Sequence, residues 1–131
     1  MKSVLFICVE NSCRSQIAEA FGKMLGQDVI ACHSSGSRPS GMINQKAIAS
    51  MRKVGYDLAT HISKSLNEIP DIEYDLAITM GCEDKCPWVR AKERQDWKIP
   101  DPKHMDAGQL DQMRDLIRGK VTNLISKYKG T

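Results

Sequence analysis

The sequence has no long hydrophobic run and no strong excess of charge of either sign. The longest apolar run near the N-terminus covers residues 4–9, which is too short for the hydrophobic region of a signal peptide or for a membrane span. The net charge of +3 slightly favours a small anionic substrate but is far from the dense basic patches of nucleic-acid-binding proteins. We therefore expect a cytoplasmic protein that binds neither membrane nor nucleic acid.

The chain also lacks internal repeats, low-complexity tracts and linker-like segments. Its 131 residues, of which 41% are apolar, suffice for one domain with a buried core, so we expect a single domain over residues 1–131. The five cysteines are an odd number and do not have the spacing of a small disulfide scaffold. In the cytoplasm such cysteines are reduced thiols or take part in redox chemistry.

Short apolar runs alternate with helical patterns along the chain, and this alternation predicts an α/β fold. We expect strands at residues 4–7, 29–32, 75–80 and 97–99, and helices after residue 14, from residue 41 or 44 to 55, and at about 106–127. Residues 34–41 and 81–96 have the composition of loops. The order of elements predicts a four-stranded parallel sheet flanked by helices.

Three segments with reactive side chains follow expected strands. They are Cys8, the Gly81-Cys82 pair and Asp101. In open parallel sheets, ligands bind beyond the carboxyl ends of the strands, so we expect these segments to form one active site.

The segment from Cys8 to Ser15 connects the first strand to the first helix. The free N–H groups and the macrodipole at a helix N-terminus favour a tetrahedral oxyanion and stabilise a cysteine thiolate. The Arg14 guanidinium suits oxyanion oxygens, Ser15 can donate a hydrogen bond to the thiolate, and Asn11 tolerates a left-handed backbone. We therefore expect Cys8 to be a nucleophile beside an oxyanion-binding loop formed by Val9, Glu10, Asn11, Ser12, Cys13 and Arg14.

This C-x5-R-S pattern between a strand and a helix resembles the signature of the low-molecular-weight protein tyrosine phosphatase superfamily. The string CVENSCRSQIAE at residues 8–19 is more similar to one branch, the thioredoxin-coupled arsenate reductases. The phosphatases usually carry proline after the Arg-Ser pair, whereas this chain has Gln16. The resemblance implies the phosphotyrosine phosphatase I-like fold.

Cys82 and Cys86 lie four residues apart in the polar segment after the third expected strand. They do not indicate a zinc site, which needs four ligands and usually has C-x2-C pairs. In a regular helix, residues at this spacing hold their Cβ atoms about 5–6 Å apart, whereas a disulfide needs about 3.5–4.5 Å. A disulfide between them therefore requires a non-helical segment. Arsenate reductases of the superfamily carry a cysteine pair here and the phosphatases lack it, so TMGCEDKCP resembles the former.

Asp101 precedes Pro102, which restricts the aspartate to an extended backbone. Facing Cys8, its carboxyl group could act as general acid toward the leaving oxygen. The Asp-Pro motif of the family has this role, and Asp101 matches it. The phosphatases generally continue with tyrosines, whereas Lys103 and His104 follow here.

The resemblance implies a reaction in which three cysteines act in turn. Cys8 attacks arsenate, and Asp101 protonates the leaving oxygen. Cys82 then attacks Cys8, and Cys86 attacks Cys82. The family implies thioredoxin as reductant, or glutaredoxin with a low-molecular-weight thiol, and we expect a monomer without a cofactor.

Two alternatives use parts of the same residue set. A low-molecular-weight phosphatase would hydrolyse phosphate monoesters through a Cys8 phosphoenzyme and would need neither Cys82 nor Cys86. A non-enzymatic thiol sensor would use those two cysteines for regulation or metal binding and would not need Asp101. Cys13 is expected to pack the loop, with an off-pathway Cys8–Cys13 disulfide as the alternative, and Cys32 is expected in the core.

Three residues match positions that bind a potassium ion in some relatives. These are Glu19, Asn11 and Ser34. A further acidic ligand of that site is replaced here by Lys64, whose positive charge would repel a cation. His33, His61 and His104 lack ligand spacing, so we expect no bound metal.

Overall fold

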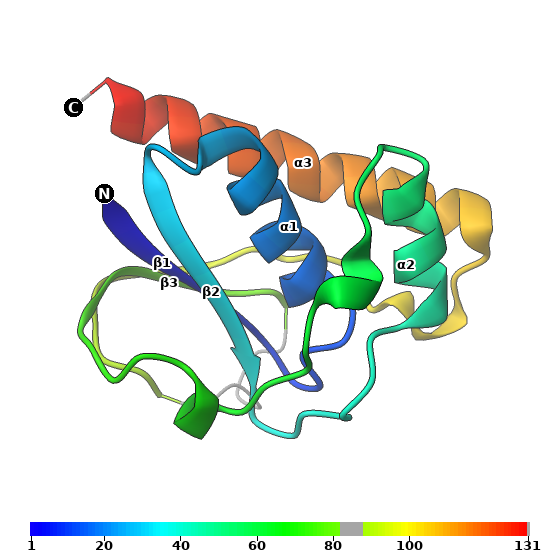
Figure 1. Ribbon diagram of the computed structural model, residues 1–131, viewed down its shortest axis with the longest axis horizontal. Coiled ribbons are helices and arrows are strands. Elements are labelled where there is room, and N and C mark those ends of the chain that lie inside the picture. The colour runs from blue at the N-terminus through cyan, green and yellow to red at the C-terminus, as the bar shows by residue number, and fades with distance from the viewer. Residues whose placement is uncertain (82–87, 131) are drawn as a thin grey trace.

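The computed structural model describes residues 1–81 and 88–130. A four-stranded parallel sheet with the order β2-β1-β3-β4 forms its centre (Figure 1). The strands are β1 Lys2–Cys8, β2 Ile30–Gly36, β3 Tyr74–Thr79 and β4 Ala91–Asp96. The helices are α1 Arg14–Gly26, α2 Gln45–Arg52 and α3 Ala107–Lys129, with short 3-10 turns η1 Leu58–Thr60, η2 Leu66–Glu68 and η4 Pro102–His104. The predicted α/β fold with four parallel strands is confirmed.

β1 is buried on both faces, which explains its unbroken apolar sequence. Val4 and Phe6 belong to the large core cluster, to which all three α-helices contribute (Figure 1). Leu5 and Ile7 point to the opposite face, where connecting segments rather than α-helices cover them. β1 lies between β2 and β3, and Cys8 at its carboxyl end pairs with Gly36 of β2, whereas the pairing with β3 ends at Ile7 and Thr79.

β2 is longer than predicted, and the expectation of a loop beginning at residue 34 is wrong. Ser34, Ser35 and Gly36 continue the strand and pair with residues 6–8 of β1. Gly36 has no room for a side chain because β2 runs close to the loop after Cys8: a Cβ atom at Gly36 would lie 2.5 Å from the Val9 carbonyl oxygen. Serine and glycine are typical of loops, but here they belong to a strand, and the glycine satisfies a steric limit.

β4 lies earlier in the chain than predicted. It covers Ala91–Asp96, whereas residues 97–99, the expected strand, follow it. β4 is an edge strand that pairs only with β3, so most of its side chains are exposed and polar and carry no hydrophobic signal. Trp97 and Ile99 are apolar because they are buried beneath the sheet edge, where the Trp97 ring lies 5.8 Å from that of Phe6.

The helix boundaries follow local capping chemistry. Asn44 caps α2 by accepting hydrogen bonds from the backbone N–H groups of Lys46 and Ala47, so the second of the two expected starts is correct. Asp106 and Gln109 form a capping box at the start of α3, close to its expected position. Cys32 is buried in the core as expected. Within the described ranges, no helix is long and apolar enough to cross a membrane.

Candidate active site

Cys8 is the last residue of β1, and its side chain is buried at the N-terminal end of α1. Its Sγ atom lies 2.8 Å from the Ser15 hydroxyl oxygen. That oxygen accepts a hydrogen bond of 2.9 Å from the Asn11 carboxamide, so the hydroxyl hydrogen can point to the sulfur. Asn11 has the left-handed backbone predicted for it, with φ of 51°. The Ser15 hydroxyl is thus oriented to donate a hydrogen bond to the Cys8 sulfur when this sulfur acts as a nucleophile.

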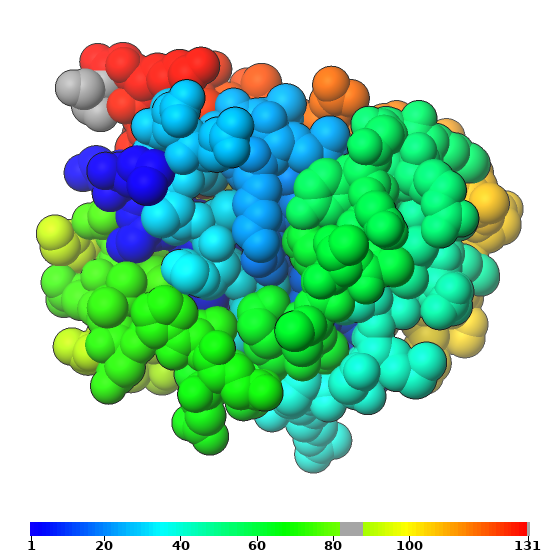
Figure 2. All heavy atoms as spheres, in the orientation of Figure 1, coloured from blue at the N-terminus to red at the C-terminus, as the bar shows by residue number. Residues whose placement is uncertain are grey.

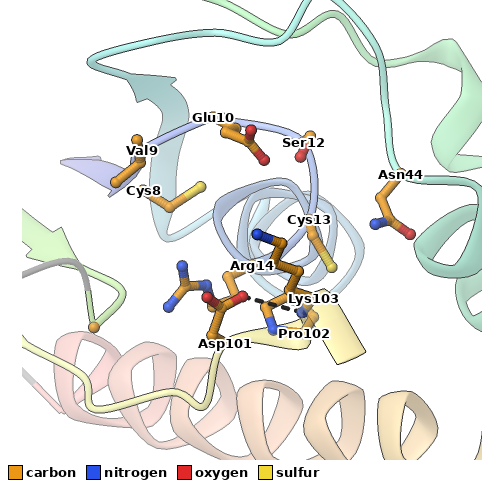
Figure 3. Close-up of a pocket in the computed structure, with 11 residues that line it drawn as sticks. Cys8, Val9, Glu10, Ser12, Cys13, Arg14, Asn44, Asp101, Pro102 and Lys103 are labelled. Atoms are coloured by element: carbon orange, nitrogen blue, oxygen red, sulfur yellow. Dashed lines mark hydrogen bonds between the residues drawn. The ribbon is translucent and has the colours of Figure 1, made fainter. Parts of the chain in front are cut away.

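A pocket opens in front of Cys8, where the carboxyl ends of three strands meet. β1 contributes Cys8, Gly81 follows β3, and Asp101 follows β4 (Figure 3). In Figure 3, Asp101 and Lys103 lie across the pocket from the loop that carries Cys8. The full lining is Cys8, Val9, Glu10, Ser12, Cys13, Arg14, Asn44, Gly81, Asp101, Pro102 and Lys103. The structure thus brings Cys8, Gly81 and Asp101 together as the order of the elements predicted.

Arg14 begins α1 and is anchored by the backbone beyond β3 and β4. Its Nη1 atom donates to the carbonyl oxygens of Met80 at 2.8 Å and Ile99 at 3.2 Å. A guanidinium carries five N–H donors in a planar fork, so the anchor leaves donors to bind an oxyanion in the pocket. Gly81 makes room for the anchor, because a Cβ atom there would lie 3.2 Å from the same Nη1 atom.

Asp101 has the extended backbone expected for a residue before proline, with φ of −67° and ψ of 123°. Its carboxylate accepts a hydrogen bond of 3.0 Å from the backbone N–H of Lys103 (Figure 3). This bond orients the carboxyl group at the start of η4, on the pocket wall that faces Cys8. A carboxyl group held in this way can deliver a proton to an oxygen bound in the pocket.

Cys13 lies in the same loop but in a different electrostatic environment. Burial and, to a smaller extent, the neighbouring Cys8 raise the pKa of its thiol to about 12. Burial and the Glu19 carboxylate likewise raise the pKa of Cys32 to about 12. Both thiols are therefore protonated at neutral pH and are poor nucleophiles. Cys82 and Cys86, the expected second and third cysteines, lie outside the described residues.

A buried polar network behind the loop was not predicted from the sequence. Gln16 donates to the Asn11 side-chain oxygen at 2.8 Å and to the Ile62 carbonyl oxygen at 2.9 Å. Its own oxygen lies 2.8 Å from Nδ1 of His61, whose Nε2 contacts the Tyr56 hydroxyl. Burial lowers the pKa of His61, so the ring is neutral at neutral pH. The only sequence signal was glutamine at a position that is proline in the phosphatases.

Two pocket residues were also not predicted as part of the site. Asn44 and Lys103 both line the pocket. The sequence indicates residue 44 only as one of two possible helix starts, and a residue at a helix start gives no sign of the pocket that it faces. Lys103 directly follows the Asp-Pro pair, where the phosphatases generally have tyrosine, and this difference alone does not predict a place in the pocket.

The residues that match a potassium site in some relatives do not fit a metal ion here. The Lys64 ammonium lies 3.5 Å from the Glu19 carboxylate and 3.4 Å from the Ser34 hydroxyl, and it donates to the Ile62 carbonyl oxygen at 2.9 Å. A positive charge among these oxygens opposes a second cation. Elsewhere in the described ranges, no group of three or more histidine, cysteine, aspartate or glutamate residues could hold a metal ion.

The sequence matches the family of low molecular weight phosphotyrosine protein phosphatases over residues 3–130, and the chain belongs to this family. It is 37% identical over 130 residues to the glutaredoxin arsenate reductase of Synechocystis sp., covering 97% of this chain and 98% of that protein. It is 35% identical to arsenate reductase 1 of Staphylococcus epidermidis, covering 92% of each chain. A solved structure described as an arsenate reductase in the phosphate binding state is 37% identical, with a TM-score of 0.87 over 98% of this chain and 99% of that one. The resemblance seen in the sequence motifs is confirmed.

Proposed function

We propose that this protein is an arsenate reductase that converts arsenate to arsenite and serves arsenic detoxification. The observation that carries the proposal is the placement of Cys8 beneath a helix N-terminus, with Ser15 at 2.8 Å and with Arg14 and Asp101 on the walls of one pocket. Relatives at 32–37% identity that span most of the chain are arsenate reductases, which supports arsenate as the oxyanion.

The first step forms a bond between Cys8 and arsenic. The backbone of residues 9–14 and the Arg14 guanidinium hold the oxyanion, and the Cys8 thiolate attacks the arsenic atom. An oxygen of arsenate leaves with a proton supplied by Asp101. The product is a covalent Cys8–arsenate adduct in which arsenic is still pentavalent.

Reduction takes place when a second thiol attacks the adduct. Cys82 attacks the Cys8 sulfur, the sulfur–arsenic bond breaks, and its electron pair stays on arsenic, which leaves as arsenite. Two thiols are thereby oxidised to a Cys8–Cys82 disulfide. Cys86 then attacks Cys82 and frees Cys8, so that the disulfide moves to the Cys82–Cys86 pair. Cys82 and Cys86 lie outside the described ranges, so the support for these two steps comes from the cysteine spacing in the sequence and from the arsenate reductase relatives.

An external thiol must reduce the Cys82–Cys86 disulfide to complete the cycle. Glutaredoxin with a low-molecular-weight thiol is one donor, which the Synechocystis relative supports by its name, and thioredoxin is the other. We propose that the protein works as a cytoplasmic monomer and that the activity resides in a single domain over residues 1–131.

The lining of the pocket favours arsenate over a phosphotyrosine substrate. Phosphotyrosine brings an aromatic ring, and aromatic side chains are absent from the pocket lining in the described part of the chain. Lys103 and Asn44 are polar and suit a compact anion. Membership of the phosphatase family makes slow hydrolysis of phosphate esters the competing activity.

Disulfide mapping after exposure to arsenate tests the proposal. Reduced wild-type protein and the Cys82→Ser and Cys86→Ser variants are incubated with arsenate, their free thiols are blocked, and peptides are identified by mass spectrometry. We expect a Cys82–Cys86 disulfide in the wild type and a Cys8–Cys82 disulfide in Cys86→Ser. If all five thiols stay free while p-nitrophenyl phosphate is hydrolysed quickly, the protein is a phosphatase.

A further inference from the structure

Lys64 connects two parts of the molecule behind the oxyanion-binding loop. Its side chain is mostly buried, with 19% of its surface exposed, and its ammonium lies between the Glu19 carboxylate of α1 and the Ser34 hydroxyl of β2. The segment that carries it, around residues 58–68 and coloured green, lies against α1 and β2 in the space-filling view (Figure 2). The ammonium thus attaches this segment to both elements that flank it.

The backbone of Lys64 reaches the loop itself. Its N–H donates to the Asn11 side-chain oxygen at 2.6 Å, and its carbonyl oxygen accepts from the Gly36 N–H at 2.9 Å. Asn11 in turn donates to Ser15, whose hydroxyl lies against the Cys8 sulfur. A chain of three contacts therefore links the Lys64 backbone to the nucleophile.

The direction of these contacts matters for Cys8. Asn11 can donate to Ser15 only while its carboxamide is turned with the oxygen toward Lys64 and Gln16, which both donate to that oxygen. If the oxygen turned toward Ser15, the hydroxyl hydrogen would point to Asn11 and not to the sulfur. The position of residue 64 therefore helps to determine whether the Ser15 hydroxyl donates its hydrogen bond to the Cys8 sulfur.

Glu19 needs positive charge at this place. The carboxylate is 4% exposed and receives hydrogen bonds or charge from Lys23, Ser34 and Lys64. Burial raises its pKa, but these partners outweigh burial and hold the pKa below its usual value. Lys23 contacts Glu19 from the solvent side and is half exposed, whereas Lys64 is the partner that also reaches Asn11.

We propose that Lys64 is a positioning residue for Cys8 and that its ammonium acts as a built-in cation. It binds Glu19, Ser34 and the Ile62 carbonyl oxygen, fixes residues 62–64, and so keeps the Asn11 carboxamide in the orientation that directs the Ser15 hydroxyl to the sulfur. The protein consequently needs no alkali cation for Cys8 reactivity. The inference rests on Cys8 as the nucleophile of the proposed function.

Alkylation of Cys8 by iodoacetamide tests the inference without arsenate. The rate at Cys8 is followed by peptide mass spectrometry at 25 °C across pH 5–9, in choline chloride and in potassium chloride of equal ionic strength. The variants are Lys64→Gln and Lys64→Arg, with Lys23→Gln as the matched control that removes the other cation on Glu19. Lys64→Met replaces Lys64→Gln if circular dichroism shows that the latter is unfolded.

We expect Cys8 in Lys64→Gln in choline chloride to be alkylated on the order of tenfold more slowly at neutral pH, because the Cys8 sulfur loses a directed hydrogen-bond donor. We expect Lys64→Arg to keep most of the wild-type alkylation rate, and Lys23→Gln to keep all of it although its melting temperature falls. Potassium should not change the alkylation rate of the wild type. It should accelerate alkylation of the neutral Lys64 variant, because the oxygen atoms that Lys64 bound can then bind the potassium ion.

The inference is overturned if Cys8 in the neutral Lys64 variant is alkylated at the wild-type rate, or if Lys23→Gln slows alkylation as much as Lys64→Gln does. It is also overturned if alkylation of the neutral variant is slow but does not respond to potassium, because the charge of Lys64 would then not matter. A wild-type rate that depends on potassium would equally contradict a built-in cation. If the alkylation results agree with expectation but arsenate is not reduced, the proposed function alone fails.

Discussion

Cys8 and Cys13 stand five residues apart in one loop and yet differ in reactivity. Cys8 faces the Ser15 hydroxyl and the N-terminal end of α1, whereas burial holds the Cys13 thiol protonated with a pKa of about 12. A few directed contacts thus decide which sulfur is the nucleophile, since both residues are buried to the same extent. The sequence predicted Cys8 as the nucleophile and Cys13 as a residue that packs the loop, but it could not show the contacts that distinguish the two sulfur atoms.

The Ser15 hydroxyl is the contact that can be removed most simply. We expect Ser15→Ala to lower the rate of Cys8 alkylation and the turnover of arsenate by about tenfold at neutral pH, because hydrogen bonds to charged groups contribute about 1.5–3 kcal/mol. Thr122→Ala, on an exposed part of α3, is the control. An unchanged alkylation rate in Ser15→Ala would show that the serine hydroxyl does not assist the Cys8 sulfur.

At the scale of elements, the sequence predicted best where hydrophobic pattern and motif agree. The β1–loop–α1 unit combines a buried strand, Cys8 and Arg14, and the sequence predicted its order and its place at the pocket, although β1 extends beyond the expected residues 4–7 to Lys2–Cys8. β4 could not be located because this exposed edge strand has no periodic apolar pattern. The strand was instead predicted at residues 97–99, where Trp97 is apolar and buried. The network through Gln16 and His61 depends on side chains 45 residues apart, which no local pattern brings together.

The turn after β3 is a place where backbone geometry and the site meet. Gly81 has φ of +85°, and a Cβ atom there would lie 2.7 Å from the Ile99 carbonyl oxygen and 3.2 Å from Arg14 Nη1. We expect Gly81→Ala to destabilise the protein by about 1–3 kcal/mol and to weaken oxyanion binding at least fivefold, because the turn and the Arg14 anchor must both move. Urea unfolding and competitive inhibition by phosphate measure the two effects.

Gly55 supplies the matched control for this experiment. It has nearly the same backbone, with φ of +84°, but a Cβ atom at this position meets nothing within 4 Å. Gly55→Ala should therefore cost backbone strain alone, on the order of 1 kcal/mol, and leave phosphate binding unchanged. If both alanine variants lose phosphate binding equally, the contact between Gly81 and Arg14 has no part in the site.

At the scale of the whole molecule, one buried and two partly buried titratable groups make stability depend on pH in the same direction. Burial lowers the pKa values of His61 and His33, and the partners of Glu19 lower its pKa despite burial. Each group binds fewer protons in the folded than in the unfolded state. Their contribution is therefore complete above the unfolded-state pKa, about 6.5 for histidine and 4.3 for glutamate, and is lost as the pH falls through the folded-state pKa.

We accordingly expect the melting temperature to fall by roughly 5 °C or more between pH 7.5 and pH 5, with a further loss at lower pH as Glu19 becomes protonated. Calorimetry in buffers of constant ionic strength measures the effect. His61→Gln should flatten the upper part of this curve, whereas His104→Gln, at an exposed position, should not. Equal melting temperatures at pH 7.5 and pH 5 would show that His33 and His61 are protonated in the folded protein.

The central position of β1 also has a consequence for how the chain reaches its working form. β1 is made first, but its partners β2 and β3 end 28 and 71 residues after Cys8, at Gly36 and Thr79. Parallel partners cannot be supplied by a tight hairpin, so β1 waits for both crossovers during synthesis. A nascent chain arrested before residue 79 lacks a complete β3 and the carbonyl oxygen of Met80 that anchors Arg14. The second anchor of Arg14, at Ile99, and the pocket residue Asp101 follow later still, so the pocket around Cys8 is completed only after more than three quarters of the chain has been made.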